Sequence, residues 1–279
     1  MTIRKLGWTL FAIVLLVSLP AVGLATDKAT PGTCSLATLK GTYGVWEQGT
    51  IVGQLPGFPP PPFPWASSAL PAYDGAGSFS GSFTASFDGA IVPGTFTGKY
   101  RVNADCTYSD QFTPLPGLVI QHKGTITGRG MFQEINYIHT EAGVVASGTF
   151  KKTPAWGCSL ATLSGTYAVF GQGTDIAVTL PGLPAPPFPW TDGGGIVTFD
   201  GKGNFSGQTT EDADGVTIPD TLTGTYTVNP GCTTSAVINT SLGLVLHQTG
   251  TITGVDESKE VHNIMTDAGW VYAETLKKQ

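Results

Sequence analysis

The chain has 279 residues, of which 41% are hydrophobic and only 12% are charged, and its formal net charge is −6 at pH 7. An acidic chain with few lysines and arginines lacks the positive surface that binds nucleic acid, so we expect no nucleic-acid partner. Glycine is abundant, with 38 residues, and together with Thr and Ser it is typical of an all-β protein with many tight turns.

Residues 1–25 have the pattern of a secretory signal peptide. Arg4 and Lys5 precede an almost wholly apolar stretch, and Gly23 and Ala25 place small residues where a signal peptidase cleaves. An uncleaved membrane anchor is the alternative, but the apolar stretch is short for a span. We therefore expect a secreted or periplasmic protein with no membrane span after signal cleavage.

The rest of the chain carries one sequence pattern twice. The segment CSLATLKGTY, which begins at Cys34, returns from Cys158 as CSLATLSGTY. The separation between the two segments is that of a whole domain and exceeds the 20–50 residues of a solenoid repeat. We therefore expect an internal duplication, with copy one at 33–152 and copy two at 157–279.

The four cysteines fall at equivalent places in the two copies. Cys34 and Cys106 belong to copy one, and Cys158 and Cys232 belong to copy two. In an oxidising compartment this arrangement predicts one disulfide within each copy. Metal binding by these cysteines is the alternative, but no Cys-x-x-Cys pair exists and the histidines are not in register with them. We therefore predict no metal and no cofactor.

Alternation of apolar and polar residues predicts strands. In residues 95–103, Phe96, Tyr100 and Val102 share one face, and residues 221–228 repeat the pattern. Asp-Gly pairs such as 88–89 and 214–215 predict tight turns between the strands. Each copy thus contains about eight antiparallel strands, which most simply close into a barrel without edges. The predicted fold class is all-β, with two tandem antiparallel eight-stranded β-barrels; β-sandwiches are the alternative.

A proline-rich segment interrupts each copy. The segment LPGFPPPPFPW at 55–65 returns as LPGLPAPPFPW at 180–190. So many prolines favour polyproline II and do not fit a sheet interior. We interpret the segment as a strap that packs on its own barrel or across the interface between the two copies. The alternatives are a lid, in which Phe63 and Trp65 or Phe188 and Trp190 close on an apolar ligand, and a segment displayed to a protein partner.

The histidines do not form a repeated site. Relative to the shared segment GTITG, His122 and His247 lie one residue apart and therefore point to opposite faces of their strands. His139 aligns with Met265. We expect surface histidines, with a site confined to one copy as the alternative.

One carboxylate is a candidate for acid–base chemistry. The apolar face of residues 79–87 in copy one corresponds in copy two to a face that carries Thr209 and Glu211. If this face points inward, the pKa of Glu211 is raised and the residue can act as a general acid or base. The alternative, which we favour, is that the strand ends earlier and Glu211 begins an acidic loop.

The repeated motifs resemble a known group of proteins. The pattern CSxATLxGTY, then FDGKGNFSG at 199–207 and TGTYTVN at 223–229, resembles uncharacterised secreted bacterial tandem β-barrel proteins. It is more distantly similar to the calycin-type barrels of allene oxide cyclase and the lipocalins. The resemblance implies eight-stranded barrels with an internal apolar pocket and implies no reaction, and no cyclase catalytic residue maps onto this chain.

Three classes of function remain. The first is an exported non-enzymatic protein that binds a small apolar or aromatic ligand, or a protein partner through the proline segments. The others are a cyclase or isomerase acting in a barrel pocket, and a structural or adhesive surface protein. Bulky aromatic residues such as Phe83 and Phe96 fill copy one, which makes copy two the better candidate for a pocket. The candidate pocket or lid residues are Phe63, Trp65, Phe188, Trp190, Thr209 and Tyr226.

Overall fold

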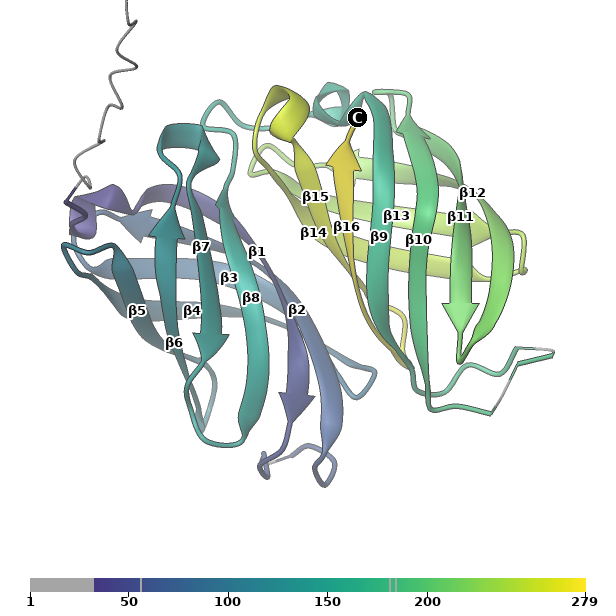
Figure 1. Ribbon diagram of the computed structural model, residues 1–279, viewed down its shortest axis with the longest axis horizontal. Coiled ribbons are helices and arrows are strands. Elements are labelled where there is room, and N and C mark those ends of the chain that lie inside the picture. Colours follow the sequence, from purple (N-terminus) through teal and green to yellow (C-terminus); the bar gives the residue numbers. More distant parts are fainter. Residues whose placement is uncertain (1–32, 56, 181, 184) are drawn as a thin grey trace, which may run out of the picture. The chain divides into compact units, whose positions relative to one another are not determined.

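Two closed antiparallel β-barrels of eight strands each follow one another along the chain (Figure 1). The computed structural model describes residues 33–55, 57–180, 182–183 and 185–279; the expected signal peptide lies outside the described residues. The barrels confirm the predicted fold class and the internal duplication, and they rule out the β-sandwich alternative. Each strand pairs with the next in the chain, and the first strand of each barrel also pairs with the last.

Barrel one consists of β1 (Lys40–Ile51), β2 (Phe63–Asp74), β3 (Ser78–Phe87), β4 (Ala90–Val102), β5 (Thr107–Leu115), β6 (Leu118–Thr127), β7 (Glu134–His139) and β8 (Val144–Lys152). Barrel two consists of β9 (Gly165–Asp175), β10 (Phe188–Phe199), β11 (Asn204–Ala213), β12 (Val216–Val228), β13 (Thr233–Thr240), β14 (Val245–Thr253), β15 (Glu260–Met265) and β16 (Trp270–Lys278). Short 3₁₀ turns lie at η1 (Leu36–Thr38), η2 (Gly130–Phe132), η3 (Leu160–Leu163) and η4 (Asp256–Ser258).

The hairpin turns and the alternating strands follow from the local sequence. Asp88 and Gly89 have φ angles of 50° and 79°, which suit the two-residue turn between β3 and β4 because glycine and aspartate tolerate this region. On β4, Phe96 and Tyr100 are buried, and Thr97 between them is exposed. Residues at a spacing of two thus share the inner face of the barrel.

Each barrel interior has two apolar layers. Near the disulfide of barrel one, Tyr43, Tyr73 and Tyr100 are buried in one cluster, with Tyr73 edge-to-face with both other rings. Such pairs are favoured by the charge distribution of the rings. At the other end, Ile51 and Val144 pack in a second cluster with the start of β2. This leaves a layer between the two clusters in which polar side chains lie.

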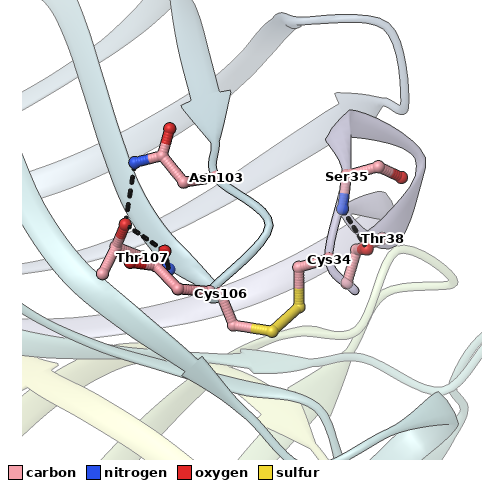
Figure 2. Close-up of a disulfide and its surroundings, with 7 residues drawn as sticks. Cys34, Ser35, Thr38, Asn103, Cys106 and Thr107 are labelled. Carbon is pink, nitrogen blue, oxygen red and sulfur yellow. Dashed lines mark hydrogen bonds between the residues drawn. A yellow bond between two sulfur atoms is a disulfide. The ribbon is translucent and has the colours of Figure 1, made fainter. Parts of the chain in front are cut away.

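A disulfide ties the start of each barrel to the turn after its fourth strand. Cys34 bonds to Cys106 and Cys158 to Cys232, which confirms the predicted pairing. Figure 2 shows Cys34 just before η1, where the Ser35 amide donates to Thr38 Oγ1 (2.9 Å). Disulfides of this kind are typical of proteins from oxidising compartments.

None of the helices in the described residues is long and apolar enough to span a membrane.

The two barrels contact each other through β1, β2 and β3 of the first and β14, β15 and β16 of the second. Ala66 on β2 is buried in one cluster with Ile264 and Val271. At the edge of this contact, Lys151 Nζ lies 2.6 Å from Glu260 Oε2. The small side chain of Ala66 lets the two sheets approach closely.

Candidate functional site

An internal cavity of about 50 Å³ lies in barrel one. Its wall is mostly apolar and aromatic, and its polar side chains are gathered on the layer between the two apolar clusters. The apolar lining includes Trp65, Phe83, Phe87, Phe112, Ile120 and Val144, and the polar lining consists of Glu47, Ser67, His122, Tyr137 and His139.

The strand register brings three of these polar side chains together. His122 on β6 is paired with His139 on β7, and Glu47 lies on β1, which closes the barrel against β8. All three residues are buried. His122 shares its face with Ile120 two residues earlier, and His139 shares its face with Tyr137, so the alternation of each strand turns both imidazoles inward.

The ligand atoms of these residues converge. His122 Nε2 lies 3.2 Å from His139 Nε2, and Glu47 Oε2 lies 3.1 Å from His139 Nε2 and 3.9 Å from His122 Nε2. Among the described residues, this is the one group of three or more His, Cys, Asp or Glu side chains whose donor atoms are close enough to hold a metal ion. Sequence reasoning predicted no metal and did not identify this group.

Each of the three side chains is oriented by a further partner. Asp110 Oδ1 lies 3.0 Å from His122 Nδ1, and Glu141 Oε1 lies 2.7 Å from His139 Nδ1. Glu47 accepts hydrogen bonds from Ser67 Oγ and from the Tyr137 hydroxyl, both at 2.5 Å. A carboxylate on Nδ1 fixes the imidazole ring and leaves Nε2 free to face the centre of the group.

The electrostatics of the group are dominated by one ion pair. Burial raises the pKa of Glu47, but the hydrogen bond and charge of His139 outweigh it and lower this pKa to about 2. Burial lowers the pKa of His139, but its hydrogen bonds to Glu141 and Glu47 outweigh it and raise this pKa to about 9. At neutral pH Glu47 is therefore an anion and His139 a cation.

Barrel two lacks this group at the equivalent positions. Gln248 and Met265, which are paired on β14 and β15, stand where barrel one has His122 and His139. Across the first and last strands, barrel one pairs Glu47 with Gly148, whereas barrel two pairs Gly171 with Glu274. The glutamate has thus moved to the opposite strand.

Barrel two instead has four buried carboxyl groups around its cavity, those of Asp192, Glu211, Asp220 and Glu274. Glu211 accepts hydrogen bonds from Trp190 Nε1 (2.8 Å) and Thr209 Oγ1 (2.6 Å). Burial, with the nearby charge of Asp192, raises the pKa of Glu211 to about 7. Burial also raises the pKa values of Asp192 and Glu274. These groups line a cavity of about 40 Å³.

The expectation that Glu211 begins an exposed loop is therefore wrong. Strand β11 continues to Ala213, and the Glu211 side chain is buried on its inner face. Sequence reasoning preferred copy two as the site of the pocket, but barrel one holds a cavity of similar volume, about 50 Å³ against about 40 Å³ in barrel two. The aromatic residues of copy one fill the barrel mainly at the disulfide end and leave space beside β6 and β7.

The predicted lid residues belong to strands. Phe63 and Trp65 begin β2 and are buried in the apolar cluster of barrel one. Phe58 of the proline-rich segment lies with its ring centroid 4.8 Å from that of Phe87, so this part of the segment packs on its own barrel. In barrel two, Phe188 and Trp190 begin β10 and are buried together. A role of these residues in ligand binding stays a prediction.

The last two candidate residues lie apart from each other. Thr209 is buried and contacts Glu211. Tyr226 is buried in the cluster near the Cys158–Cys232 disulfide, where its hydroxyl donates to the Leu160 carbonyl (3.1 Å). Tyr226 therefore packs as a core residue.

The expectation of surface histidines is correct for His247 and wrong for the other three, His122, His139 and His262. The His247 side chain is 51% exposed, whereas His122 and His139 are buried. The opposite orientation predicted for His122 and His247 is thus confirmed. The period-two spacing of His122 from Ile120 and of His139 from Tyr137 is the signal that could have placed both inside.

Comparisons with known proteins add little. No protein-family model and no curated protein matches the chain. One similar solved structure is a protein of unknown function from the DUF3598 family of Nostoc punctiforme, at 12% sequence identity and a TM-score of 0.22. The match covers 88% of this chain and 98% of that chain. A TM-score of this size supports no inference about fold or function.

Proposed function

We propose that the protein is an exported, non-enzymatic binding protein that holds a small molecule in the cavity of barrel one. The observation that carries this proposal is the form of the cavity, which has an apolar aromatic wall and one polar side. Such a cavity favours a ligand with an apolar body and a single polar group. Export is supported by the signal-like pattern of residues 1–25 and by the two disulfides.

The unpaired indole N–H of Trp65 indicates that the polar group of the ligand is a hydrogen-bond acceptor. Trp65 lines the cavity and is buried, and its indole Nε1 has no hydrogen-bond partner among the described residues. In barrel two the equivalent Trp190 donates to Glu211, whereas barrel one has Ala85 at that position. A buried donor without a partner costs about 1–3 kcal/mol. A ligand oxygen beside Trp65 would recover this energy.

The volume limits the ligand to a small one. An engineered protein cavity that binds benzene has a volume of about 150 Å³, so a cavity of about 50 Å³ admits only a few heavy atoms. Short-chain alcohols and carboxylic acids have this size and carry an oxygen acceptor. They are the ligand class that fits.

Nuclear magnetic resonance of the indole N–H groups tests the proposal. Addition of 1-propanol or propionate should shift the Trp65 signal and leave that of Trp156, whose residue is 74% exposed, unchanged. In Trp65→Phe the saturable shifts of other signals from the cavity, such as the methyl groups of Ile120 and Val144, should disappear, and Trp156→Phe is the matched control. Native mass spectrometry of the chain from its source, before and after organic extraction, would detect a resident ligand. An unresponsive Trp65 and an unchanged mass would instead favour the structural or adhesive class.

A second candidate function has one specific observation in its favour. Glu211 is a buried carboxyl whose pKa is raised to about 7 by burial and by Asp192, and a general acid or base is most effective near the working pH. A cyclase or isomerase acting in barrel two would use it. Loss of turnover in Glu211→Gln, with a substrate found by extraction of the native protein, would support this candidate.

A further inference from the structure

We propose that Glu47, His122 and His139 bind one divalent transition-metal ion, with Zn²⁺ as the best fit, inside barrel one. Two imidazole nitrogens and one carboxylate oxygen are a ligand set of catalytic zinc sites and of other transition-metal centres. Ca²⁺ and Mg²⁺ prefer sites made entirely of oxygen. The donor set thus selects the class of metal.

The distances between the ligand atoms fit one ion. Zn–N and Zn–O bonds of about 2.0–2.2 Å in a tetrahedron place neighbouring ligand atoms about 3.3–3.5 Å apart. The three separations are 3.1 Å from Glu47 to His139, 3.2 Å between the histidines and 3.9 Å from Glu47 to His122. Two separations fall slightly below this range and one lies above it, so small shifts of the Glu47 carboxylate and of the imidazoles would place all three atoms around one ion.

The surroundings of the ligands are those of a metal site. Metal-bound histidines usually hold a carboxylate or carbonyl on the other ring nitrogen, and here Asp110 and Glu141 both do so. The charged partners of the two imidazoles are all carboxylates: Glu47, Asp110 and Glu141. A buried group of this composition favours a cation at its centre.

Three protein ligands leave one coordination position of a tetrahedral ion for another molecule. All three residues line the cavity of barrel one, so this position opens on the cavity. The metal site and the small-molecule proposal share this cavity, and Trp65 packs edge-to-face against His139 with ring centroids 5.3 Å apart. They can still be tested separately, because Trp65 supplies no ligand atom to the ion.

Barrel two is an internal reference. Gly171, Gln248 and Met265 occupy the positions equivalent to the three ligands, so the chain should bind one ion with this affinity. The same residues show which replacements a barrel of this fold accommodates. His122→Gln and His139→Met are therefore suitable test variants.

Titration of the metal-free, disulfide-bonded chain with Zn²⁺ in a calorimeter tests the proposal. The expected result is one ion per chain, with His122→Gln and His139→Met each weakening binding by more than about 100-fold. Glu141→Gln and Asp110→Asn should weaken it by about 10- to 100-fold, as is usual for groups that orient a ligand. His247→Gln, at the exposed histidine, is the matched control and should leave affinity and stoichiometry unchanged.

Two further measurements test the metal site without relying on the folding of the histidine variants. If a variant fails to fold, histidine resonances of the unmodified protein should show Zn²⁺ shifting the ring signals of His122 and His139 and sparing that of His247. The Trp65→Phe variant should keep its zinc affinity, which separates this proposal from small-molecule binding. Absence of zinc binding, or a full ion per chain in the His122→Gln/His139→Met double variant, would overturn the metal site.

Discussion

His122 and His139 face each other on neighbouring strands β6 and β7, and their Nε2 atoms lie 3.2 Å apart in the interior of barrel one. A carboxylate holds the opposite ring nitrogen of each, Asp110 for His122 and Glu141 for His139. Barrel two has the same strands and closure without these histidines. The pair is therefore not a requirement of the fold.

Zinc should stabilise the protein. A ligand that binds only the folded state adds about 2.7 kcal/mol to the free energy of unfolding when its free concentration is 100 times Kd. Urea unfolding with and without saturating Zn²⁺ measures this gain, and a chelator should reverse it. The gain should disappear in His122→Gln and persist in His247→Gln. An equal gain in both variants would mean that zinc acts elsewhere.

The free energy of unfolding should depend on pH because of the buried carboxyl of Glu211 in barrel two. Burial raises the pKa of Glu211 to about 7 in the folded state, while an unfolded glutamate has a pKa of about 4.3. The folded state thus holds the proton more tightly, so its contribution to stability is complete below about pH 4.3 and is lost as pH rises through about 7. The loss is on the order of 4 kcal/mol.

The variant Glu211→Gln isolates this contribution. It keeps a polar side chain beside Trp190 and Thr209 but cannot ionise. Urea unfolding at pH 5 and pH 8 should show a smaller decrease of the unfolding free energy in the variant than in the unmodified protein. Equal decreases in both proteins would show that Glu211 does not carry the dependence.

The variant Ala85→Glu should fill the cavity of barrel one, because it gives the indole N–H of Trp65 a hydrogen-bond acceptor. Ala85→Glu places a carboxyl at the position of Glu211 in barrel two, where it can accept from the indole as Glu211 does from Trp190. We expect the indole signal of Trp65 to shift and then to stop responding to 1-propanol or propionate. Ala85→Val, which adds volume but no acceptor, is the comparison. A response that survives Ala85→Glu would place the ligand elsewhere.

Removal of either disulfide should destabilise the protein to a similar degree. The bonded cysteines are 72 residues apart in copy one and 74 in copy two, and loss of a native disulfide typically costs about 2–5 kcal/mol. Cys34→Ser/Cys106→Ser and Cys158→Ser/Cys232→Ser should therefore give matched decreases in urea unfolding. A large decrease in one variant alone would show that the barrels differ in how they depend on the bond.

The fold could be predicted from the sequence because its signals are local. The alternation around Phe96 and Tyr100, the Asp88-Gly89 turn and the repeat beginning at Cys34 are each readable within a few residues. Closure into barrels was the simplest expectation because it removes the edges of such a meander, although a β-sandwich was also compatible with the sequence. Both disulfides followed from their equivalent places in the two copies.

The polar site could not be predicted in the same way because it is assembled by strand register. Glu47 is far from His122 and His139 in the chain and reaches them only when β1 closes the barrel. When the two copies are aligned position by position, Gly171 stands at the place of Glu47, which suggests that barrel two has lost the glutamate. The glutamate has instead moved to the neighbouring strand. Glu47 opposite Gly148 becomes Gly171 opposite Glu274, and only the pairing across the strands reveals it.

Glycine at position 148 is part of this arrangement. A Cβ there would collide with the hydroxyl of Tyr137, which donates to Glu47. Gly148→Ala should therefore displace Tyr137 and weaken zinc binding through the orientation of Glu47. Gly215 has no atom within 4 Å of a Cβ but has a φ of 84°, so Gly215→Ala strains only its turn and serves as a control. Equal zinc affinity in the unmodified protein and Gly148→Ala would separate Tyr137 from the site.

The most direct measurement is X-ray diffraction at the zinc absorption edge from a crystal grown with one equivalent of Zn²⁺ per chain. The metal site predicts a single strong anomalous peak inside barrel one, about 2.0–2.2 Å from His122 Nε2, His139 Nε2 and a Glu47 carboxylate oxygen. An empty barrel one in a crystal whose protein carries zinc at another place would contradict it.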